Sequence, residues 1–454
     1  MRPLERALTG ALPLAAAAAA TPLGRWPLLL PAVLAGAQAL LEGWRWQLAP
    51  AYGLALASLC WATHWGQASF GLAAALAVLF GVLAAAPPWL FPLVHLPLPT
   101  GPHAVGTVTY HWVDEARRTA ASAGIARAPR ELMVQLWYPA SEVAGAPRAR
   151  YLEAGQALAA LAKLLRLPAL ALRHLAEVIT NAVARAPAAR GELPFPVVLF
   201  SPGRGGYRQH SSAQMEGLAS HGYVVAALDH PGAAAGVVFP GGRVTPFDPR
   251  MADDAFADAM VGLLAEDACF VLRQLARLDG QDPAGPLAGR LDLERVGIYG
   301  MSLGGQVAVE ACRREPAFQA CVALDAWMPT SVAEAGLTRP TLLVVRDAAS
   351  MRREGWSEPA IRRVEDTVQR TFGALTGGGY LVRLTGLFHA DFTDAPLLSP
   401  LARFLGVAGP LPPARTHALV SAILLGFFDR HLRALPTAAL LDPAAFPEAV
   451  LEAR

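Results

Sequence analysis

The sequence predicts an α/β domain, with a mainly parallel sheet covered by helices on both faces, preceded by a region of transmembrane helices. Two observations support this fold class. From residue 104 onward, short apolar stretches alternate with longer segments of helical periodicity, which is typical of parallel strands joined by helices. A long stretch earlier in the chain is uncharged, because no Asp, Glu, Lys or Arg lies between Arg45 and Asp114. A chain of 454 residues is long enough for two such units.

The composition agrees with one apolar part and one ordinary globular part. Hydrophobic residues make up 54% of the chain and charged residues only 16%, which is less charge than a soluble domain usually carries. The formal net charge is +2, so the totals give no electrostatic sign of a nucleic-acid partner. The four cysteines lack the paired spacing of a zinc or redox site. Cys312 and Cys321 would pair in an oxidising compartment and are otherwise expected as buried thiols.

The N-terminal region, residues 1–95, is predicted to cross a membrane three or four times. A span needs about 20 mostly apolar residues, and the last two of four uncharged stretches satisfy this well. The second stretch is short and contains Pro27 and Pro31, and the first also resembles a secretory signal peptide. The alternative is a buried helical subdomain. The four stretches are residues 7–24, 26–41, 46–63 and 65–94.

The distribution of arginines suggests an orientation. Arg2, Arg6 and Arg45 fall on one side of a four-span arrangement and Arg25 on the other, so the positive-inside rule places the N-terminus in the cytoplasm. An even number of spans returns the second domain to the cytoplasm, the side that we favour, whereas three spans would place it outside. We therefore expect a multi-pass protein of a bacterial inner membrane.

The second domain is expected to cover residues 104–435, with a C-terminal tail over residues 436–454. Its predicted strands are short, apolar and bounded by turn residues, as in a sheet that is buried on both faces. The candidate strands are Val105–Trp112, Leu132–Tyr138, Pro196–Ser201, Tyr223–Leu228, Val296–Tyr299, Cys321–Leu324, Thr341–Val345 and Tyr380–Leu384, and helices include Met251–Leu278 and Leu303–Arg314.

An insert over residues 151–185 interrupts this pattern with two amphipathic helical segments broken at Pro168. Its basic residues are consistent with a pair of helices that lies on a bilayer or covers a binding site. Packing of both helices against the core is an equal alternative. The residues that share a helical face are Leu158, Leu161 and Leu165 in the first segment and Leu172, Leu175 and Ile179 in the second.

One pentapeptide carries the clearest chemical signal. Residues 300–304 read Gly-Met-Ser-Leu-Gly and match the G-x-S-x-G pattern, in which the serine lies on a tight turn between a strand and a helix. A short predicted strand precedes the pattern and a helical segment follows it. The sequence therefore predicts that Ser302 is the nucleophile of an α/β-hydrolase.

A serine nucleophile needs a histidine base, which in this fold follows the serine along the chain. His389 comes after a predicted strand, on a loop, whereas His417 and His431 fall in the final helical stretch. Functional side chains are more often found on loops that a rigid scaffold positions. We therefore predict His389 as the base.

Two aspartates are candidates for the acid that orients the base. Asp325 and Asp347 each follow a predicted strand, at the carboxyl ends where ligand sites of open α/β sheets form. Position alone does not choose between them. Asp391 and Asp394 lie close to His389 in sequence and are expected to be loop or capping residues.

The oxyanion of an ester reaction needs two preorganised backbone donors. One is expected from the N–H of Leu303, directly after the serine, and the other from the N–H of Arg204. Arg204 lies in the loop Ser201-Pro202-Gly203-Arg204-Gly205-Gly206, whose glycines let the backbone approach a substrate. A phosphate cradle or a plain turn is the alternative for this loop, although it lacks the lysine of a P-loop.

Residues 105–430 resemble the plasma-type (group VII) phospholipase A2 family, the platelet-activating factor acetylhydrolases. The most specific similarities surround Asp325 and His389, where the chain reads Leu-Asp-Ala-Trp-Met and His-Ala-Asp-Phe. The other matching stretches are Val134–Pro139, Val198–Gly203, Leu218–Tyr223 and the turn around Ser302.

The resemblance implies that Asp325 is the acid, that His389 is the base and that the N–H groups of Arg204 and Leu303 form the oxyanion hole. It also implies catalysis without a metal ion or cofactor, on phospholipids with short or oxidised acyl chains that are reached from a membrane or lipoprotein surface. A general carboxylesterase, similar to polyester hydrolases or dienelactone-hydrolase-like esterases, is the second interpretation. A membrane-anchored binding module without activity is the third, and the complete Ser–Asp–His set argues against it.

Overall fold

The computed structural model forms two compact units, one over residues 1–94 with 399–401, the other over residues 95–398 with 402–454. Arg25 and residues 436–443 of the expected tail lie outside the residues that the structure describes. The described ranges are 1–18, 26–64, 70–118, 128–141, 145–152, 155–191, 194–281, 285–435 and 444–454.

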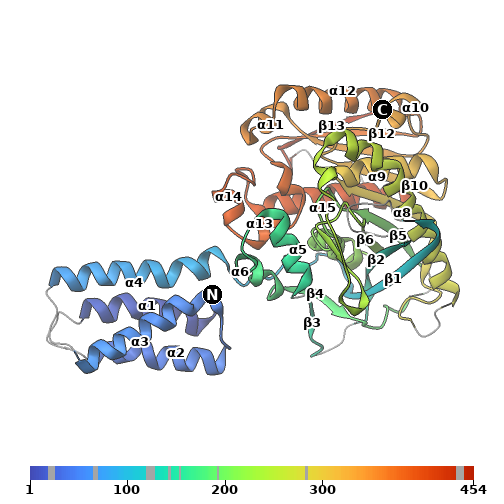
Figure 1. Ribbon diagram of the computed structural model, residues 1–454. Coiled ribbons are helices and arrows are strands. Elements are labelled where there is room, and N and C mark those ends of the chain that lie inside the picture. The colour runs from blue at the N-terminus through green and yellow to red at the C-terminus, as the bar shows by residue number, and fades with distance from the viewer. Residues whose placement is uncertain are drawn as a thin grey trace. The chain divides into compact units, whose positions relative to one another are not determined.

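The first unit consists of helices that lie side by side (Figure 1). Their inner faces bury Leu8, Leu12 and Leu48, and a buried ion pair joins Arg45 to Glu5 at 2.7 Å. Over the described residues, no helix combines the length and the apolar character that crossing a bilayer requires, so the three or four expected spans are not supported. The elements are α1 (Pro3–Ala18), η1 (Trp26–Leu29), α2 (Leu30–Leu41), η2 (Trp46–Leu48), α3 (Ala49–His64) and α4 (Phe70–Leu90).

The second unit contains a mixed sheet with strand order β13-β12-β11-β10-β9-β5-β6-β2-β1-β4-β3. Its central strands, from β12 to β6 in this order, run parallel, whereas β2 pairs antiparallel with both β6 and β1. All residues of β5, β6 and β11 are buried, which explains their nearly continuous apolar sequences. The strands are β1 (Ala104–Arg118), β2 (Pro129–Ala140), β3 (Arg148–Arg150), β4 (Ile179–Ala184), β5 (Phe195–Ser201), β6 (Val224–Asp229), β9 (Leu291–Met301), β10 (Phe318–Leu324), β11 (Thr341–Arg346), β12 (Gly379–Leu384) and β13 (Ala449–Ala453).

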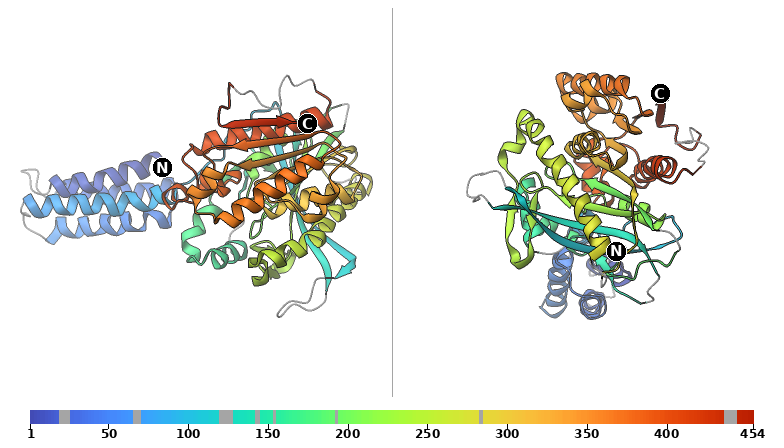
Figure 2. Two further views of the ribbon diagram at one scale, coloured as in Figure 1. Left: turned by 90° about the horizontal axis from the view of Figure 1, so that it is seen from above. Right: turned by 90° about the vertical axis from the view of Figure 1, so that its right-hand side faces the viewer.

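Helices cover both faces of this sheet, as the two further views show (Figure 2). One face packs against α8 (Asp254–Gln281), α9 (Leu303–Arg314) and α12 (Glu358–Ala374). The other face packs against α7 (Ser212–Ser220) and α15 (Pro413–Leu432). The remaining elements are α5 (Gln156–Leu165), α6 (Ala169–Leu172), η3 (Arg173–Ala176), η4 (Pro240–Gly242), η5 (Pro249–Ala252), α10 (Thr330–Ala335), α11 (Ala348–Glu354), η6 (His389–Phe392), α13 (Ala395–Leu398), α14 (Leu401–Phe404) and the hairpin β7 (Gly236–Val238) with β8 (Val244–Pro246).

The structure contains each of the eight predicted strands but differs from the sequence prediction in two segments. The second helical pattern of the insert is wrong in part: Leu172 and Leu175 lie in the short helical turns α6 and η3, but Ile179 begins β4. Pairing of β4 with β1 and β3 outweighs the local helical periodicity there. The expected tail is also wrong in part, because Ala449–Ala453 extends the sheet as β13, antiparallel to β12. Cys312 and Cys321 are buried free thiols.

Candidate active site

Ser302 lies on the sharp turn between β9 and α9. Its backbone has φ 57° and ψ −124°, a strained conformation that a non-glycine residue adopts only when its surroundings enforce it. The Ser302 N–H donates to the Leu324 carbonyl at 2.8 Å and so ties the turn to the end of β10. The side chain is thereby held at the carboxyl end of the central strands.

Steric clashes explain why both outer positions of the G-x-S-x-G pattern are glycines. A Cβ atom on Gly300 would lie 2.0 Å from the Gly304 carbonyl oxygen, and one on Gly304 would lie 2.0 Å from the Ser201 carbonyl oxygen. Both distances are far inside van der Waals contact, so neither position accepts a side chain. Gly304 thus allows the loop after β5 to pack directly against the turn that carries Ser302.

Asp325 and His389 are hydrogen-bonded to each other, although 64 positions separate them in the chain. His389 Nδ1 lies 2.5 Å from Asp325 Oδ2. A carboxylate only accepts hydrogen bonds, so Nδ1 carries the proton and Nε2 of a neutral His389 keeps the lone pair of a base. Asp325 directly follows Leu324, the partner of the Ser302 N–H. The structure therefore brings all three predicted residues to neighbouring strand ends.

Asp325 is held in its ionised form by its surroundings. Burial alone would raise the pKa of Asp325, but the charge of Arg346 and the hydrogen bond from His389 outweigh it and lower the pKa to about 2. Arg346 Nε lies 2.7 Å from Asp325 Oδ2, and both side chains are buried. Asp325 consequently stays ionised at neutral pH.

Three further residues support this pair and were missed by sequence reasoning. Glu354 forms an ion pair with Arg346, and its carboxylate accepts the His389 backbone N–H at 3.1 Å. The Trp356 ring lies against both side chains, 5.7 Å from the His389 ring and 4.7 Å from the Arg346 guanidinium carbon. No motif marks these residues, and the one local signal was the position of Arg346 at the end of a predicted strand.

The rival acids have other partners. Asp347 caps α11 by accepting the Ser350 N–H at 2.7 Å, and it also accepts from the Thr385 hydroxyl at 2.8 Å. Asp391 accepts two backbone N–H groups, from Phe388 at 2.6 Å and Gly409 at 2.8 Å. Both aspartates therefore stabilise local backbone structure instead of orienting His389.

The rival histidines and Asp394 also lie apart from this arrangement. His417 and His431 are on α15, and the His431 ring packs 4.7 Å from that of Phe427. Asp394 is buried and its carboxylate accepts the Ala213 N–H at 3.2 Å. These residues belong to the packing of helices on the sheet.

The loop from Ser201 to Gly206 passes close to Ser302. A Cβ atom on Gly203 would lie only 3.2 Å from the Ser302 Cβ, and Arg204 is the next residue. The Arg204 side chain turns away to the Met251 carbonyl at 3.0 Å and to Asp254 at 2.8 Å. The structure thus places Gly203 beside Ser302, with Arg204 next in the loop, and Leu303 begins α9 directly after Ser302.

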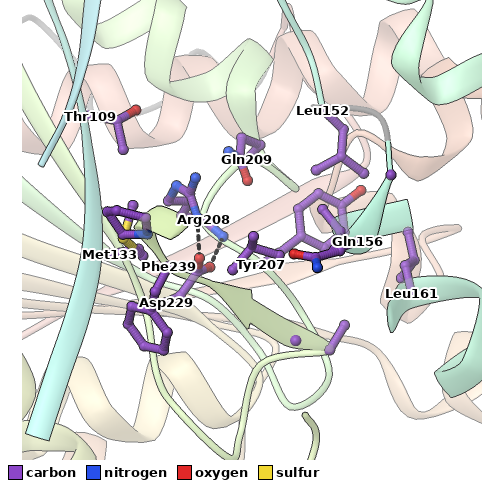
Figure 3. Close-up of a pocket in the computed structure, with 16 residues that line it drawn as sticks. Thr109, Met133, Leu152, Gln156, Leu161, Tyr207, Arg208, Gln209, Asp229 and Phe239 are labelled. Atoms are coloured by element: carbon purple, nitrogen blue, oxygen red, sulfur yellow. Dashed lines mark hydrogen bonds and ion pairs between the residues drawn. The ribbon is translucent and has the colours of Figure 1, made fainter. Parts of the chain in front are cut away.

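A cavity of about 500 Å³ borders the same loop (Figure 3). Tyr207, Arg208 and Gln209 form part of its wall just beyond the loop, and Ala235, also in the wall, donates its N–H to the Gly206 carbonyl at 3.0 Å. Asp229 accepts the Arg208 backbone N–H at 2.6 Å and forms an ion pair with the Arg208 guanidinium. The two charges in this part of the cavity wall therefore neutralise each other. The apolar wall includes Met133, Leu152, Leu161 and Phe239.

The insert contributes to this cavity through α5. Gln156, Ala157 and Leu161 line it, and the Leu164 side chain reaches Gly205, where a Cβ atom would lie 2.7 Å away. Ser302, Asp325 and His389 do not line the cavity. The cavity therefore borders the loop after β5 without including the side chains of Ser302, Asp325 and His389.

Comparison with known proteins gives consistent results. The family model described as platelet-activating factor acetylhydrolase, isoform II, matches residues 90–239 and 283–436. A platelet-activating factor acetylhydrolase of Cavia porcellus is 28% identical over 156 residues, which is 30% of this chain and 35% of that protein. The enzyme of that name from Canis lupus familiaris is 25% identical over 33% of this chain and 39% of its own length. The chain thus spans little more than a third of the length of these curated relatives.

A solved structure resembles a larger share of the chain. The ferulic acid esterase from Streptomyces cinnamoneus has a TM-score of 0.64 and 33% sequence identity, over 79% of this chain and 99% of that one.

Proposed function

Because the chain belongs to the platelet-activating factor acetylhydrolase, isoform II, family, we propose that it is a serine hydrolase of carboxylic esters. In this proposal Ser302 is the nucleophile, His389 is the base and Asp325 orients the base. The observation that carries the proposal is the 2.5 Å hydrogen bond from His389 Nδ1 to the ionised Asp325. It leaves Nε2 as a base at the strand ends where the strained turn presents Ser302.

The reaction follows from these positions. Ser302 Oγ attacks the ester carbonyl while His389 Nε2 takes its proton, and Asp325 stabilises the imidazolium that forms. The N–H groups of Arg204 and Leu303 donate to the oxyanion of the tetrahedral intermediate. His389 then returns the proton to the leaving alcohol. Water, deprotonated by His389, attacks the acyl-enzyme; the carboxylic acid is released as His389 gives that proton to Ser302 Oγ, which restores the free serine.

The direct test combines a probe with a substitution. The full chain in detergent is treated with a fluorophosphonate, which labels activated serines, and is assayed with p-nitrophenyl acetate. Labelling at Ser302 and loss of both signals in Ser302→Ala are the expected results. An unlabelled and inactive wild-type protein would favour a binding module, and hydrolysis that survives in Ser302→Ala would refute the choice of nucleophile.

The proposed substrates are phospholipids with short acyl chains, or related lipid esters. The two relatives named platelet-activating factor acetylhydrolase support this class. The cavity beside the oxyanion loop supports it as well, because apolar walls and a charge-neutralised polar side suit an amphipathic group of the ester. We place one part of the substrate in this cavity, with the scissile carbonyl at Ser302.

Filling the cavity tests its use. Ala157→Trp on α5 should raise KM for a short-acyl phospholipid by about tenfold and leave KM for p-nitrophenyl acetate unchanged. Ala159→Trp is the matched control, because Ala159 is exposed on the same helix and does not line the cavity. Equal KM values for the phospholipid in both variants would exclude the cavity as a substrate site.

A general carboxylesterase is the second candidate function, and one observation favours it. The match to this chain covers 99% of the ferulic acid esterase structure, at 33% identity. The matches to the two curated acetylhydrolases cover only 35% and 39% of those proteins. The ratio of kcat/KM for a short-acyl phospholipid to that for methyl ferulate, an ester of a hydroxycinnamic acid, separates the two functions. A preference for methyl ferulate would replace the lipid proposal.

We also propose that the first unit holds the protein at a bilayer, with the catalytic unit on the cytoplasmic side. Its helices expose many large apolar side chains, which would be covered by acyl chains or headgroups. Flotation of the full chain with phospholipid vesicles tests the binding, and protease protection in inverted membrane vesicles tests the side. The most exposed of these side chains are Leu14, Trp26, Val33, Leu40, Leu41 and Val78.

A further inference from the structure

A second Ser–His–Asp chain lies outside the predicted triad. Ser201 Oγ is 2.9 Å from His230 Nε2, and His230 Nδ1 is 3.0 Å from Asp267 Oδ2. The three residues come from the end of β5, from the position after β6 and from the middle of α8. The order of atoms is that of a catalytic triad, although neither the pattern around Ser302 nor the family resemblance points to it.

Burial excludes Ser201 as a second nucleophile. Ser201 and Asp267 are completely buried, and His230 is 2% exposed. A substrate carbonyl therefore cannot reach the Ser201 hydroxyl without unfolding the end of β5. These hydrogen bonds must therefore stabilise a part of the protein structure and do not act directly on a substrate.

The surrounding charges fix the direction of these hydrogen bonds. Arg130 binds Asp267 with two nitrogens, at 2.6 and 2.5 Å, and Arg117 adds a third contact at 2.8 Å. Burial opposes ionisation of Asp267, but the Arg130 charge outweighs it and lowers the pKa of Asp267. An ionised carboxylate only accepts, so Nδ1 of His230 donates to it, and Nε2 of a neutral His230 accepts from the Ser201 hydroxyl.

The hydrogen bonds among Ser201, His230 and Asp267 hold one end of the loop from Ser201 to Gly206. Ser201 is the last residue of β5, directly before Pro202, and its hydroxyl is anchored to His230. The turn that follows His230 holds the other end, because Gly205 donates to the Ala233 carbonyl at 2.7 Å and Ala235 donates to the Gly206 carbonyl at 3.0 Å. Both ends of the loop that carries the Arg204 N–H are therefore connected to the same segment.

We propose that Ser201, His230 and Asp267 are positioning residues for the oxyanion hole. They hold the loop so that the Arg204 N–H points to the oxyanion that forms on the Ser302 adduct, and this inference rests on the proposed ester hydrolysis. Oxyanion donors act only within about 2.7–3.1 Å of the developing charge. A small displacement of the loop consequently reduces the stabilisation of the transition state more than it reduces the binding of the substrate.

Two substitutions break the contact between Ser201 and His230 from opposite sides. Ser201→Ala removes the hydroxyl. His230→Asn keeps a donor for Asp267, because the amide nitrogen replaces Nδ1, but it removes the acceptor for Ser201. Ser220→Ala is the matched control, since Ser220 is an equally buried serine at the end of α7.

The experiment uses the full chain in detergent, with p-nitrophenyl acetate as substrate and a trifluoromethyl ketone as inhibitor. The ketone adds to Ser302 as a hemiketal whose oxyanion occupies the same hole. In both variants kcat should fall about tenfold, KM should stay within twofold, and the inhibition constant should rise by the same factor as kcat falls. Combining the two substitutions should add little, because both break one contact.

A merely structural role predicts a different outcome. It would lower the melting temperature and leave kcat per titrated active site and the inhibition constant at their wild-type values, which would overturn the proposal. If Ser201→Ala does not fold, His230→Asn provides the same comparison, because the inhibition constant is measured on the folded fraction. An inactive wild-type protein would instead refute the proposed ester hydrolysis.

Discussion

The exchange of Asp325 for asparagine tests the candidate site most sharply, because it changes one charge and almost no volume. In the wild-type protein the carboxylate requires the proton of His389 to be on Nδ1. The amide of an asparagine can instead donate to Nδ1, which moves the proton to Nε2 and removes the base. A change of tautomer of this kind lowers kcat by about ten-thousandfold, or about 5 kcal/mol of transition-state stabilisation.

The same exchange has a predictable effect on stability. The pKa of Asp325 falls from an ordinary 3.8 to about 2 in the folded chain, which corresponds to about 2 kcal/mol in favour of the folded state at neutral pH. Because the folded state has the lower pKa, this contribution is complete above about pH 4 and is lost as the pH falls towards 2. The difference in unfolding free energy between wild type and Asp325→Asn should therefore shrink over that interval.

The assay is kcat for p-nitrophenyl acetate at pH 7, together with urea unfolding between pH 7 and pH 2. Asp347→Asn is the matched control, because Asp347 ends the neighbouring strand but caps α11, and asparagine is an equally good helix cap. It should keep kcat, and it should cost less stability than Asp325→Asn, because Asp347 is only partly buried. A kcat of Asp325→Asn within tenfold of wild type, or an equal loss in Asp347→Asn, would refute the assignment of the acid.

Three further predictions concern the supports of the site and the fold. Gly304→Ala should abolish activity and destabilise the protein by more than about 3 kcal/mol, because its Cβ would lie 2.0 Å from the Ser201 carbonyl oxygen. The control is Gly217→Ala on α7, where a Cβ meets nothing within 4 Å. This control should be neutral or stabilising in thermal melts. Arg346→Met should reduce kcat/KM most at acidic pH, because Asp325 loses the charge that opposes its burial, and Arg346→Lys should recover part of the loss in a pH–rate profile. Burial raises the pKa of Glu216 to about 7, so wild-type stability should decrease as the pH rises from 5 to 8, and a Glu216→Gln variant that keeps the same pH dependence would refute this.

The local features of the fold and site could be predicted from the sequence. Apolar stretches predicted the central strands because strands buried on both faces need apolar residues at every position. The turn around Ser302 was predictable because its strain and its glycines act within five residues. His389 could be selected because a loop after a strand is a local property as well.

The tertiary structure alone decided which distant residues meet. Asp325 and Asp347 each directly follow one of two adjacent strands and look equivalent in sequence. Only the packing of the loop around His389 decides that Asp325 is hydrogen-bonded to His389, whereas Asp347 caps α11. The same holds for Arg346, Glu354 and Trp356, which no pattern connects.

The hydrogen bonds of Ser201, His230 and Asp267 and the edge strands show why sequence patterns do not predict contacts between distant residues. His230 and Asp267 are 37 positions apart, and β4 and β13 form only because partner strands are available. A periodic pattern reports the face that a segment buries, whereas a hydrogen bond between distant segments depends on how all the elements between them pack. The sequence by itself therefore determined the strands of the sheet and singled out Ser302 as the candidate nucleophile, and the tertiary structure decided which distant residues contact one another.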